Sequence, residues 1–493
     1  MLGAGPGPQR VPRAETIPTA ETVVLAMLGA GPGPVPHRRD LPEGPRISPL
    51  LAMVAPRARD ETRSMSTPTE TDRPTWSPEL DLASRAFWAQ PFDVREQAFA
   101  HFRREHPVAY HRAYESTLLP PDEDTPGFWS ITKWDHCRQV SRDVDTFISG
   151  QGILMEDMPE VVTLATTSFL AMDGAEHRQV RGIVSQAFTP RNVRKIDGWI
   201  HGIAKDLVDE IIERGEGDIV DLYAKQLPGR IFAFFFGVEA GSEDMYTIME
   251  AAERMLAWDD PNCALGRDAL TTFAEEAERI QDIAMARADH YREHPAENLV
   301  SWVVNAQFED RVLEDWEVAA FFSLLGSAAN DTTRHSIGHA FRLFHEHPTQ
   351  LALLQEDMAG RSDTAVEEIL RYVSPVQHFR RTAIKDTEVG GQEIKAGEKL
   401  VLWYCSGNYD EDVFENPSRF DILRTPNKHL GFGAGGPHFC IGSALGREMI
   451  KATLQQVYTR MPDLHLTAEP ELQVNNFIHG IHAAQAAWTP SKA

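Results

Sequence analysis

A glycine-rich loop around one cysteine constrains this chain more than any other part of its sequence. The segment Gly431–Gly442 reads GFGAGGPHFCIG, with five glycines and a proline, so it is neither a helix interior nor a strand interior. The next segment, Ile441–Tyr458, has helical periodicity. Cys440 is therefore expected at a helix N-terminus, where free backbone N–H groups favour a thiolate. The alternative is a structural cysteine beside a turn.

A rigid thiolate shielded by a phenylalanine suits an axial ligand of haem iron. The spacing of Phe432, Gly433, His438 and Cys440 resembles the cysteine loop of the cytochrome P-450 family, the haem-thiolate monooxygenases. Phe432 stands eight residues before the cysteine, as in a bacterial subgroup that hydroxylates sterol side chains and methyl-branched lipids. The resemblance implies that Cys440 ligates the iron of haem b and that Phe432 and Gly433 lie against this cofactor.

Residues 315–345 are predicted to form one long helix with an unusual middle. The segment GSAANDTT, residues 326–333, places an amide, a carboxylate and two threonine hydroxyls inside an apolar run. These side chains compete for backbone hydrogen bonds, so we expect the helix to open locally here. The segment resembles the family's oxygen-activation motif, with Asp331 and Thr332 as the acid–alcohol pair. The resemblance implies that Thr332 acts beside dioxygen and that Asp331 passes protons inward from solvent.

The resemblance implies a role for two further groups of residues. Glu368 and Arg371 are spaced i, i+3 on one face of a predicted helix, a pattern that alone indicates a surface ion pair. The family has a structural ion pair at this place, and Arg419 is expected as its third member. Haem also carries two propionates, which need cations or hydrogen-bond donors. The resemblance assigns this role to His177, Arg181, Arg381 and His438, for each of which a solvated basic residue is the alternative.

The resemblance extends from about residue 87 to residue 488, and several apolar segments within it are expected to form the substrate pocket. An apolar pocket suits a hydrophobic substrate. By analogy with the subgroup, the substrate is expected to be a methyl-branched lipid, a sterol side chain or a terpenoid. The pocket residues predicted are Leu325, Ala328, Val376, Phe477 and Ile478.

The reaction that the resemblance implies is insertion of one atom of dioxygen into an unactivated C–H bond, with water as co-product. Two electrons must come from outside, because the chain has no flavin or dinucleotide fingerprint. A ferredoxin with an NAD(P)H-dependent reductase is expected to supply them. Two alternatives stay open: an enzyme of the same fold that uses peroxide or catalyses a rearrangement, and a non-enzymatic haem binder.

The charge of the chain restricts its partners. Lys and Arg number 48 against 73 acidic residues, a net charge of −25 that argues against nucleic acid or an anionic membrane as the main partner. The longest apolar stretch, residues 318–329, is too short to span a bilayer, so a cytoplasmic location is expected. An acidic ferredoxin nevertheless needs a local basic face, for which the candidates are Arg178, Arg181, Arg191, Arg424 and Lys428.

The first part of the chain differs in composition from the rest. Residues 1–64 contain 11 of the 32 prolines and no lysine, and they repeat the octamer MLGAGPGP. We expect a disordered leader here, arising from an upstream start codon with Met65 as the true start. A transit or export signal is the alternative. The chain is therefore divided into a leader, 1–74, and one domain, 75–493.

The domain is predicted to be mainly α-helical with a minor antiparallel β-sheet, the fold that the resemblance implies. Strand patterns occur at residues 108–111 and 128–132. A third group spans residues 387–404, where the pairs GG at 390–391 and AG at 396–397 predict the turns of a small meander.

Overall fold

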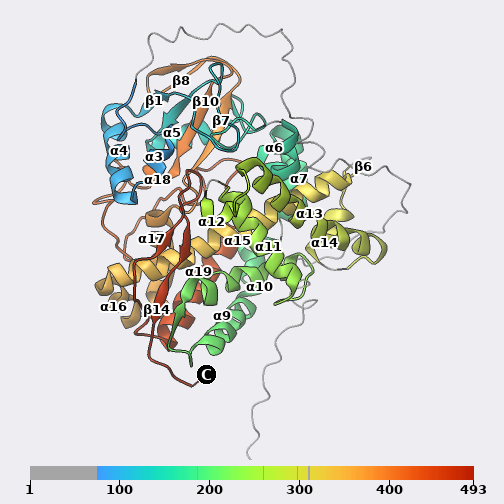
Figure 1. Cartoon of the computed structure of the whole chain (residues 1–493), viewed down its shortest axis with the longest axis vertical. Coiled ribbons are helices and arrows are strands. Elements are labelled where there is room, and N and C mark those ends of the chain that lie inside the picture. The colour runs from blue at the N-terminus through green and yellow to red at the C-terminus, as the bar shows by residue number, and fades with distance from the viewer. Residues whose placement is uncertain are drawn as a thin grey trace, which may run out of the picture.

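The structure is a computed structural model that describes residues 75–492 except 159, 186, 259, 297, 309 and 310. The predicted leader, residues 1–74, lies outside the described residues. Figure 1 shows a smaller part built around strands β1, β7 and β10, and a larger helical part through which α15 runs. Across the described residues, no helix combines the length and apolarity that crossing a membrane requires.

Helices dominate the structure, and several begin at a side-chain cap. Ser242, Asp268 and Asn298 each accept a hydrogen bond from the backbone N–H three residues ahead, and Glu314 and Glu317 form a capping box at the start of the longest helix. The helices are α3 (Arg85–Trp88), α4 (Phe92–Glu105), α5 (Trp134–Arg142), α6 (Glu160–Thr167), α7 (Gly174–Ser185), α8 (Pro190–Val193), α9 (Asp197–Ile211), α10 (Gln226–Phe235), α11 (Glu243–Leu256), α12 (Pro261–Ala264), α13 (Ala269–Glu293), α14 (Leu299–Val304), α15 (Asp315–Glu346), α16 (Pro348–Glu356), α17 (Met358–Val373), α18 (Tyr404–Gly407) and α19 (Ser443–Arg460), with a 3₁₀ helix at Ser168–Ala171 and a π-helix at Val220–Ala224.

The strands form one five-stranded sheet and several small ones. The large sheet has the order β1-β2-β10-β7-β3, in which β10 runs parallel to β2 and antiparallel to β7. The smaller sheets are β11-β14-β4, β12-β13, β5-β6 and β8-β9. The strands are β1 (Val108–His111), β2 (Phe128–Ile131), β3 (Phe147–Ile148), β4 (Glu216–Asp218), β5 (Gln307–Phe308), β6 (Arg311–Val312), β7 (His378–Ala383), β8 (Thr387–Val389), β9 (Gln392–Ile394), β10 (Lys399–Trp403), β11 (His465–Leu466), β12 (Glu471–Leu472), β13 (Ile481–Ala483) and β14 (Gln485–Ala487).

The helix-rich fold with minor sheets confirms the predicted fold class, but the predicted meander is wrong. Gly390 and Gly391 do form a turn, with φ angles of 58° and 81°, and they join β8 to β9 as a hairpin. After the second turn, at Gly397, β10 leaves this hairpin and pairs with β2 and β7 instead. All five residues of β10 are buried, which suits a central strand rather than the edge of a hairpin.

The expectation that the long helix opens at residues 326–333 is also wrong. α15 is continuous through this segment. The hydroxyl of Thr332 donates to the carbonyl oxygen of Ala328 at 2.8 Å, and Ser327 and Asn330 bond one turn back in the same way. A carbonyl oxygen has two lone pairs, so it accepts these hydrogen bonds in addition to the helical one.

Glu368 on α17 is fully buried at the centre of an ion cluster. Its carboxylate accepts hydrogen bonds from Nε and Nη2 of Arg371 at 2.8 Å each. It also accepts one from Nε of Arg424 at 3.1 Å and one from Nδ2 of Asn427 at 3.0 Å. Arg371 is equally buried, and its Nη1 donates to the carbonyl oxygen of Asn408 at 2.8 Å. The cluster thus joins α17 to the irregular chain that precedes the cysteine loop.

The prediction that Arg419 is the third member of this cluster is wrong for its side chain. The guanidinium of Arg419 is 66% exposed, and its carbonyl oxygen alone takes part, accepting from Arg424 at 3.0 Å. Arg424 supplies the second cation, with a side chain that is 10% exposed. Both arginines lie in irregular chain, where the sequence pattern does not indicate which side chain turns inward.

We predict that Glu368→Gln lowers the free energy of unfolding by about 3–5 kcal/mol, because two buried guanidinium groups then lack a counter-charge. Arg424→Ala should also destabilise the protein by more than about 1 kcal/mol. Arg419→Ala keeps the carbonyl oxygen and should stay within about 0.5 kcal/mol of the parent. Urea denaturation followed by circular dichroism measures all three, and equal losses for the two arginine variants would contradict the assignment.

Candidate functional site

The cysteine loop is fixed between α5 and α19. Gly435 and Gly436 have φ angles of 92° and 79°, which other residues rarely adopt. A Cβ on Gly436 would lie 2.4 Å from the carbonyl oxygen of Ser141 on α5, whose hydroxyl donates to the carbonyl oxygen of Gly435 at 2.8 Å. The backbone N–H of Cys440 donates to the carbonyl oxygen of Phe432 at 3.0 Å, which closes the loop. Cys440 is therefore held just before the first turn of α19.

Cys440 differs from the other three cysteines because they are buried and it is exposed on one side. The atoms packed around its sulfur raise the pKa of the thiol by desolvation. The backbone N–H of Gly442 and the cations Arg181 and Arg447 act in the opposite direction, since they stabilise a thiolate. Cys440 thus combines an exposed position with nearby positive charge, which suits a metal ligand.

Phe432 and Gly433 lie at the start of the same loop. The guanidinium of Arg447 on α19 stands 4.3 Å from the centre of the Phe432 ring. Gly433 has a φ angle of 96°, and a Cβ there would meet no described atom within 4 Å. The loop is therefore packed on one side and open at Gly433, as contact with a flat cofactor requires.

Four basic side chains predicted from the sequence converge on this loop. The ring of His177 on α7 is buried and lies 4.3 Å from the ring of His438. Arg181, one turn further along α7, donates from Nη2 to the carbonyl oxygen of Phe439 at 2.5 Å. Burial lowers the pKa of His438, and the nearby cations Arg381 and Arg181 add to this effect.

The hydrogen-bonding capacity of these groups is only partly used by the protein. His177 Nε2 and His438 Nδ1 are buried without a hydrogen-bond partner among the described residues. Arg381 on β7 is 4% exposed, and within the described chain it has no carboxylate partner within 4.0 Å. Burial, with His438 and Arg181, lowers the pKa of His177 to about 4, so this ring is neutral at pH 7. Unused donors and an uncompensated cation fit the two propionates of haem b.

Arg380, the neighbour of Arg381 on β7, is occupied elsewhere. Its Nη1 lies 2.6 Å from Oδ1 of Asp157, and its Nη2 donates to the carbonyl oxygen of Gln151 at 3.0 Å. Successive residues of a strand face opposite sides, so the two arginines serve different surroundings. Arg381 is therefore the arginine of the two whose charge can pair with a bound anionic group.

Asp331 and Thr332 are neighbours on α15 but line different cavities. Thr332 lines an apolar cavity, whereas Asp331 lines a polar one. Consecutive helical residues point about 100° apart, which explains the separation. The buried carboxylate of Asp331 lies 2.8 Å from Nη2 of Arg334 and 3.2 Å from Nε2 of His335. Asp331 and Thr332 therefore face two different cavities from the same helix.

A charged network continues from Asp331 through the polar cavity. Nη1 of Arg334 lies 2.7 Å from Oε2 of Glu253 on α11, and Nδ1 of His482 lies 3.3 Å from Oε1 of the same carboxylate. Nε2 of His482 lies 2.9 Å from Asp260. Although burial lowers the pKa of His482, its two carboxylate partners raise it to about 9. The cavity also has charged groups at Asp221, Lys225 and Glu250.

Glu253, Cys263 and His482 have the spacing of a metal site, since their ligand atoms lie within 4.8 Å of one another. Both ring nitrogens of His482 face carboxylates, however, so an imidazolium leaves no lone pair for a metal. The guanidinium of Arg334 already neutralises Glu253 at 2.7 Å. These residues therefore form a charge network rather than a cation site.

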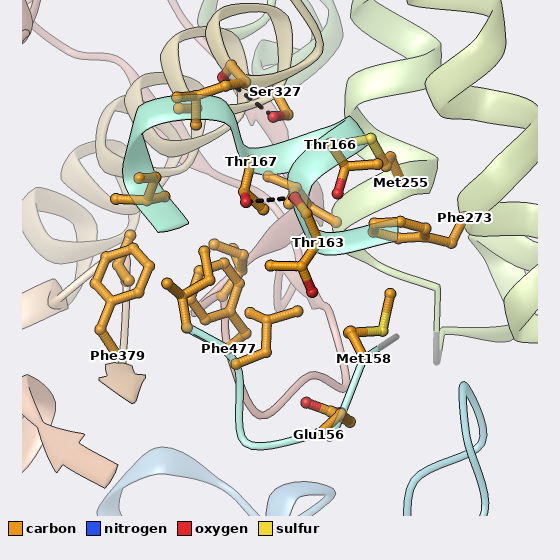
Figure 2. Close-up of a pocket in the computed structure, with 18 of the residues that line it drawn as sticks. Glu156, Met158, Thr163, Thr166, Thr167, Met255, Phe273, Ser327, Phe379 and Phe477 are labelled. Carbon is orange, nitrogen blue, oxygen red and sulfur yellow. Dashed lines mark hydrogen bonds between the residues drawn. The ribbon is translucent and has the colours of Figure 1, made fainter. Parts of the chain in front are cut away.

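The apolar cavity contains about 760 Å³ of empty space, part of it open to solvent. Figure 2 shows its walls, which come from the segment 152–170, α11, α13, α15, the segment 376–379 around the start of β7 and the segment 477–478. Its largest apolar side chains are those of Ile153, Leu154, Met158, Leu170, Met255, Leu256, Trp258, Phe273, Leu324, Val376, Phe379, Phe477 and Ile478.

Four of the five predicted pocket residues line this cavity: Ala328, Val376, Phe477 and Ile478. The prediction of Leu325 is wrong, because Leu325 packs in the helical core and its neighbour Leu324 lines the cavity instead. The lining residues of α11 and α13 were not predicted. Their helical pattern indicates an apolar face but not which distant segment that face meets.

Comparisons with known proteins agree with this geometry. Residues 156–460 match the family model described as cytochrome P450. A methyl-branched lipid omega-hydroxylase of Mycobacterium tuberculosis is 36% identical over 414 residues, which cover 83% of this chain and 95% of the relative. A steroid C26-monooxygenase of Mycolicibacterium smegmatis is 34% identical over 368 residues, covering 74% of this chain and 84% of the relative.

Among solved structures, a Mycobacterium marinum cytochrome P450 in complex with pseudoionone superposes with a TM-score of 0.81. It is 40% identical, and the match covers 85% of this chain and 100% of that one. The fold, the match to the family over most of the domain and the named relatives agree. The chain belongs to the cytochrome P450 family.

Proposed function

We propose that this cytochrome P450 hydroxylates an unactivated C–H bond in a methyl-branched lipid, a sterol side chain or a terpenoid. Membership of the family and relatives named as hydroxylases make it a haem-dependent monooxygenase. The observation that carries the proposal is Thr332, which lines an apolar cavity on one side of α15 while Asp331 lines a polar cavity on the other. An apolar substrate and a source of protons can then approach the same helix separately.

The thiolate of Cys440 would bind the iron of haem b, and Phe432 and Gly433 would lie against this cofactor. His177, Arg181, Arg381 and His438 are proposed to hold the two propionates. Haem b supplies the iron at which dioxygen is reduced and cleaved. The protein fixes the thiolate, pairs the propionates and surrounds the substrate with apolar side chains that exclude water.

The proposed reaction consumes two electrons and two protons for each dioxygen molecule, and it yields one hydroxyl group and one water. Asp331 is proposed to take protons from the network of Arg334, Glu253 and His482 and to move them toward Thr332. The Thr332 hydroxyl donates to the carbonyl oxygen of Ala328 and keeps its lone pairs at the cavity wall, so it can accept a hydrogen bond from a water in the path. Rotation of the Asp331 side chain breaks either its ion pair with Arg334 or its contact with His335, so these two contacts control the proposed proton transfer.

A peroxide-driven or rearranging enzyme of the same fold needs no delivery of protons from solvent. The charged network that reaches Asp331 favours the monooxygenase over these alternatives. Turnover with dioxygen, a ferredoxin and its reductase tests the proposal. Product formed with peroxide alone, and none with the complete electron-transfer system, would favour the alternative.

A cytoplasmic ferredoxin is proposed as the electron donor. Two of the five candidate cations are occupied, since Arg424 pairs with Glu368 and Arg181 binds the carbonyl oxygen of Phe439. The other three, Arg178, Arg191 and Lys428, are exposed. Arg142 is also exposed, and it lies on α5 beside Gly435 of the cysteine loop.

We predict that Cys440→His removes the red-shifted Soret band of the reduced carbonyl complex, because an imidazole replaces the thiolate. Cys263→Ala changes a cysteine outside the loop and should keep the band. Absorption spectra of the purified holoproteins measure both, and a Cys440→His protein that keeps the band contradicts the ligand assignment.

We predict that Asp331→Asn lowers the rate of product formation by about 10²-fold or more, as expected for loss of a proton donor. Thr332→Ala should let dioxygen consumption continue while hydrogen peroxide replaces product. The neighbouring Thr333 does not line the apolar cavity, so Thr333→Ala is the matched control and should keep most of the yield. Oxygen uptake, peroxide and product are measured together; equal yields for the two threonine variants would exclude the proposed role of Thr332.

We predict that Arg178→Glu combined with Lys428→Glu lowers the ferredoxin-supported rate at low ionic strength by about tenfold or more, because steering by charge sets the association rate. Arg214→Glu is the control, because Arg214 is exposed just after α9. This helix contacts Arg460 at the C-terminal end of α19, whereas Cys440 precedes the N-terminal end of α19. Stopped-flow reduction of the haem at several salt concentrations measures the effect. An unchanged rate in the double variant would contradict docking of the ferredoxin at Arg178 and Lys428.

A further inference from the structure

Glu156 is the one charged side chain among the described residues that line the apolar cavity. It is 4% exposed, and its Oε1 accepts a hydrogen bond from Nδ2 of Asn476 at 3.2 Å. Figure 2 shows Glu156 at the end of the cavity opposite Ser327 of α15. The carboxylate therefore lies away from the face of α15 that carries Thr332.

Four of the five hydroxyl groups that line the cavity present acceptors rather than donors, and the hydroxyl of Thr163 is the fifth. Thr166, Thr167, Ser327 and Thr332 each donate to the backbone carbonyl oxygen four residues earlier, at distances of 2.6 to 2.8 Å. Their lone pairs remain for a ligand. Trp258 Nε1 is a neutral donor, buried without a partner among the described residues. Neutral donors such as Trp258 Nε1 and the Thr163 hydroxyl stabilise a buried carboxylate far less than a cation does.

The cations close to Glu156 do not make the cavity favourable for an anionic ligand. Arg380 and Lys399 both interact with Glu156, but neither lines the cavity. Both are paired with Asp157, at 2.6 Å and 2.5 Å. Among the described residues, the two cations next to Glu156 are thus both held by Asp157, and neither is left unpaired to meet an anionic substrate.

This arrangement treats two common polar ends of a lipid differently. A carboxylate placed beside the buried carboxylate of Glu156 must take up a proton or accept strong repulsion. A hydroxyl can donate to Glu156, and such a hydrogen bond to a charged group is stronger than one between neutral groups.

We propose that the cavity selects an uncharged substrate whose polar end is a hydroxyl bound by Glu156, and that it discriminates against the corresponding free carboxylic acid. The proposal rests on the proposed function, because it takes this cavity as the substrate site. With the hydroxyl at Glu156, the apolar end of the substrate extends toward Thr332. Oxygen is then inserted at the end of the molecule remote from its own hydroxyl group.

The test uses three probes with one branched skeleton: 3,7,11-trimethyldodecan-1-ol, the corresponding carboxylic acid and its methyl ester. Their dissociation constants for the holoprotein at pH 8 are measured from the haem spin-state shift and by calorimetry. We expect the alcohol to bind at least about tenfold more tightly than the acid, and the affinity of the ester to lie between the two. In Glu156→Gln the acid should gain about tenfold while the ester changes little, because the amide removes the repulsion and keeps the shape.

Met158→Leu is the matched control, since Met158 lines the same region without charge and should alter the acid and alcohol affinities by the same factor. Equal affinities for acid and alcohol in the parent protein would overturn the proposal, and this comparison needs no variant to fold. A Glu156→Gln protein that keeps the parent's preference would overturn it as well. If none of the three probes binds, the substrate class under the proposed function fails instead, so the two failures are distinguishable.

Discussion

The buried carboxylate of Glu368 is the interaction on which the cofactor side of this molecule depends. It binds two arginines and an asparagine, and it thereby ties α17 to the irregular chain before the cysteine loop. The adjacent carboxylate of Glu367 accepts from His429 at 2.8 Å and from Arg447 at 3.0 Å. His429 precedes the loop and Arg447 follows it, so one turn of α17 holds both ends.

The second constraint is the course of α15 between two unlike cavities. An unbroken helix separates an apolar space, lined by Ala328 and Thr332, from a polar space that contains Asp331 and Glu253. The hydroxyl and amide side chains of its middle satisfy carbonyl oxygens of the same helix, so they add polarity without breaking it. The polar cavity therefore reaches Asp331, which is the direct neighbour of Thr332 in the wall of the apolar cavity.

Features set by local spacing were predictable from the sequence, whereas features set by long-range packing were not. The loop of Cys440 is a local pattern, because its glycines and the following helix are contiguous. The choice of Arg424 over Arg419 depends on how irregular chain folds back onto a helix more than 40 residues earlier. The contributions of Phe273 to the apolar cavity and of Glu253 to the polar one depend on which helices meet α15. A period of 3.6 residues defines an apolar face but not its partner.

The same helical geometry lets α7 serve two kinds of negative charge. His177 and Arg181 are one turn apart and face the cysteine loop, where their unused donors suit propionates. Arg178 is rotated by about 100° from His177 and is exposed. A chain with a net charge of −25 repels an acidic partner over most of its surface, so the proposed ferredoxin would approach at exposed cations such as Arg178. Under the proposed function, electrons would enter on the side of Cys440, without any excess of positive charge in the protein as a whole.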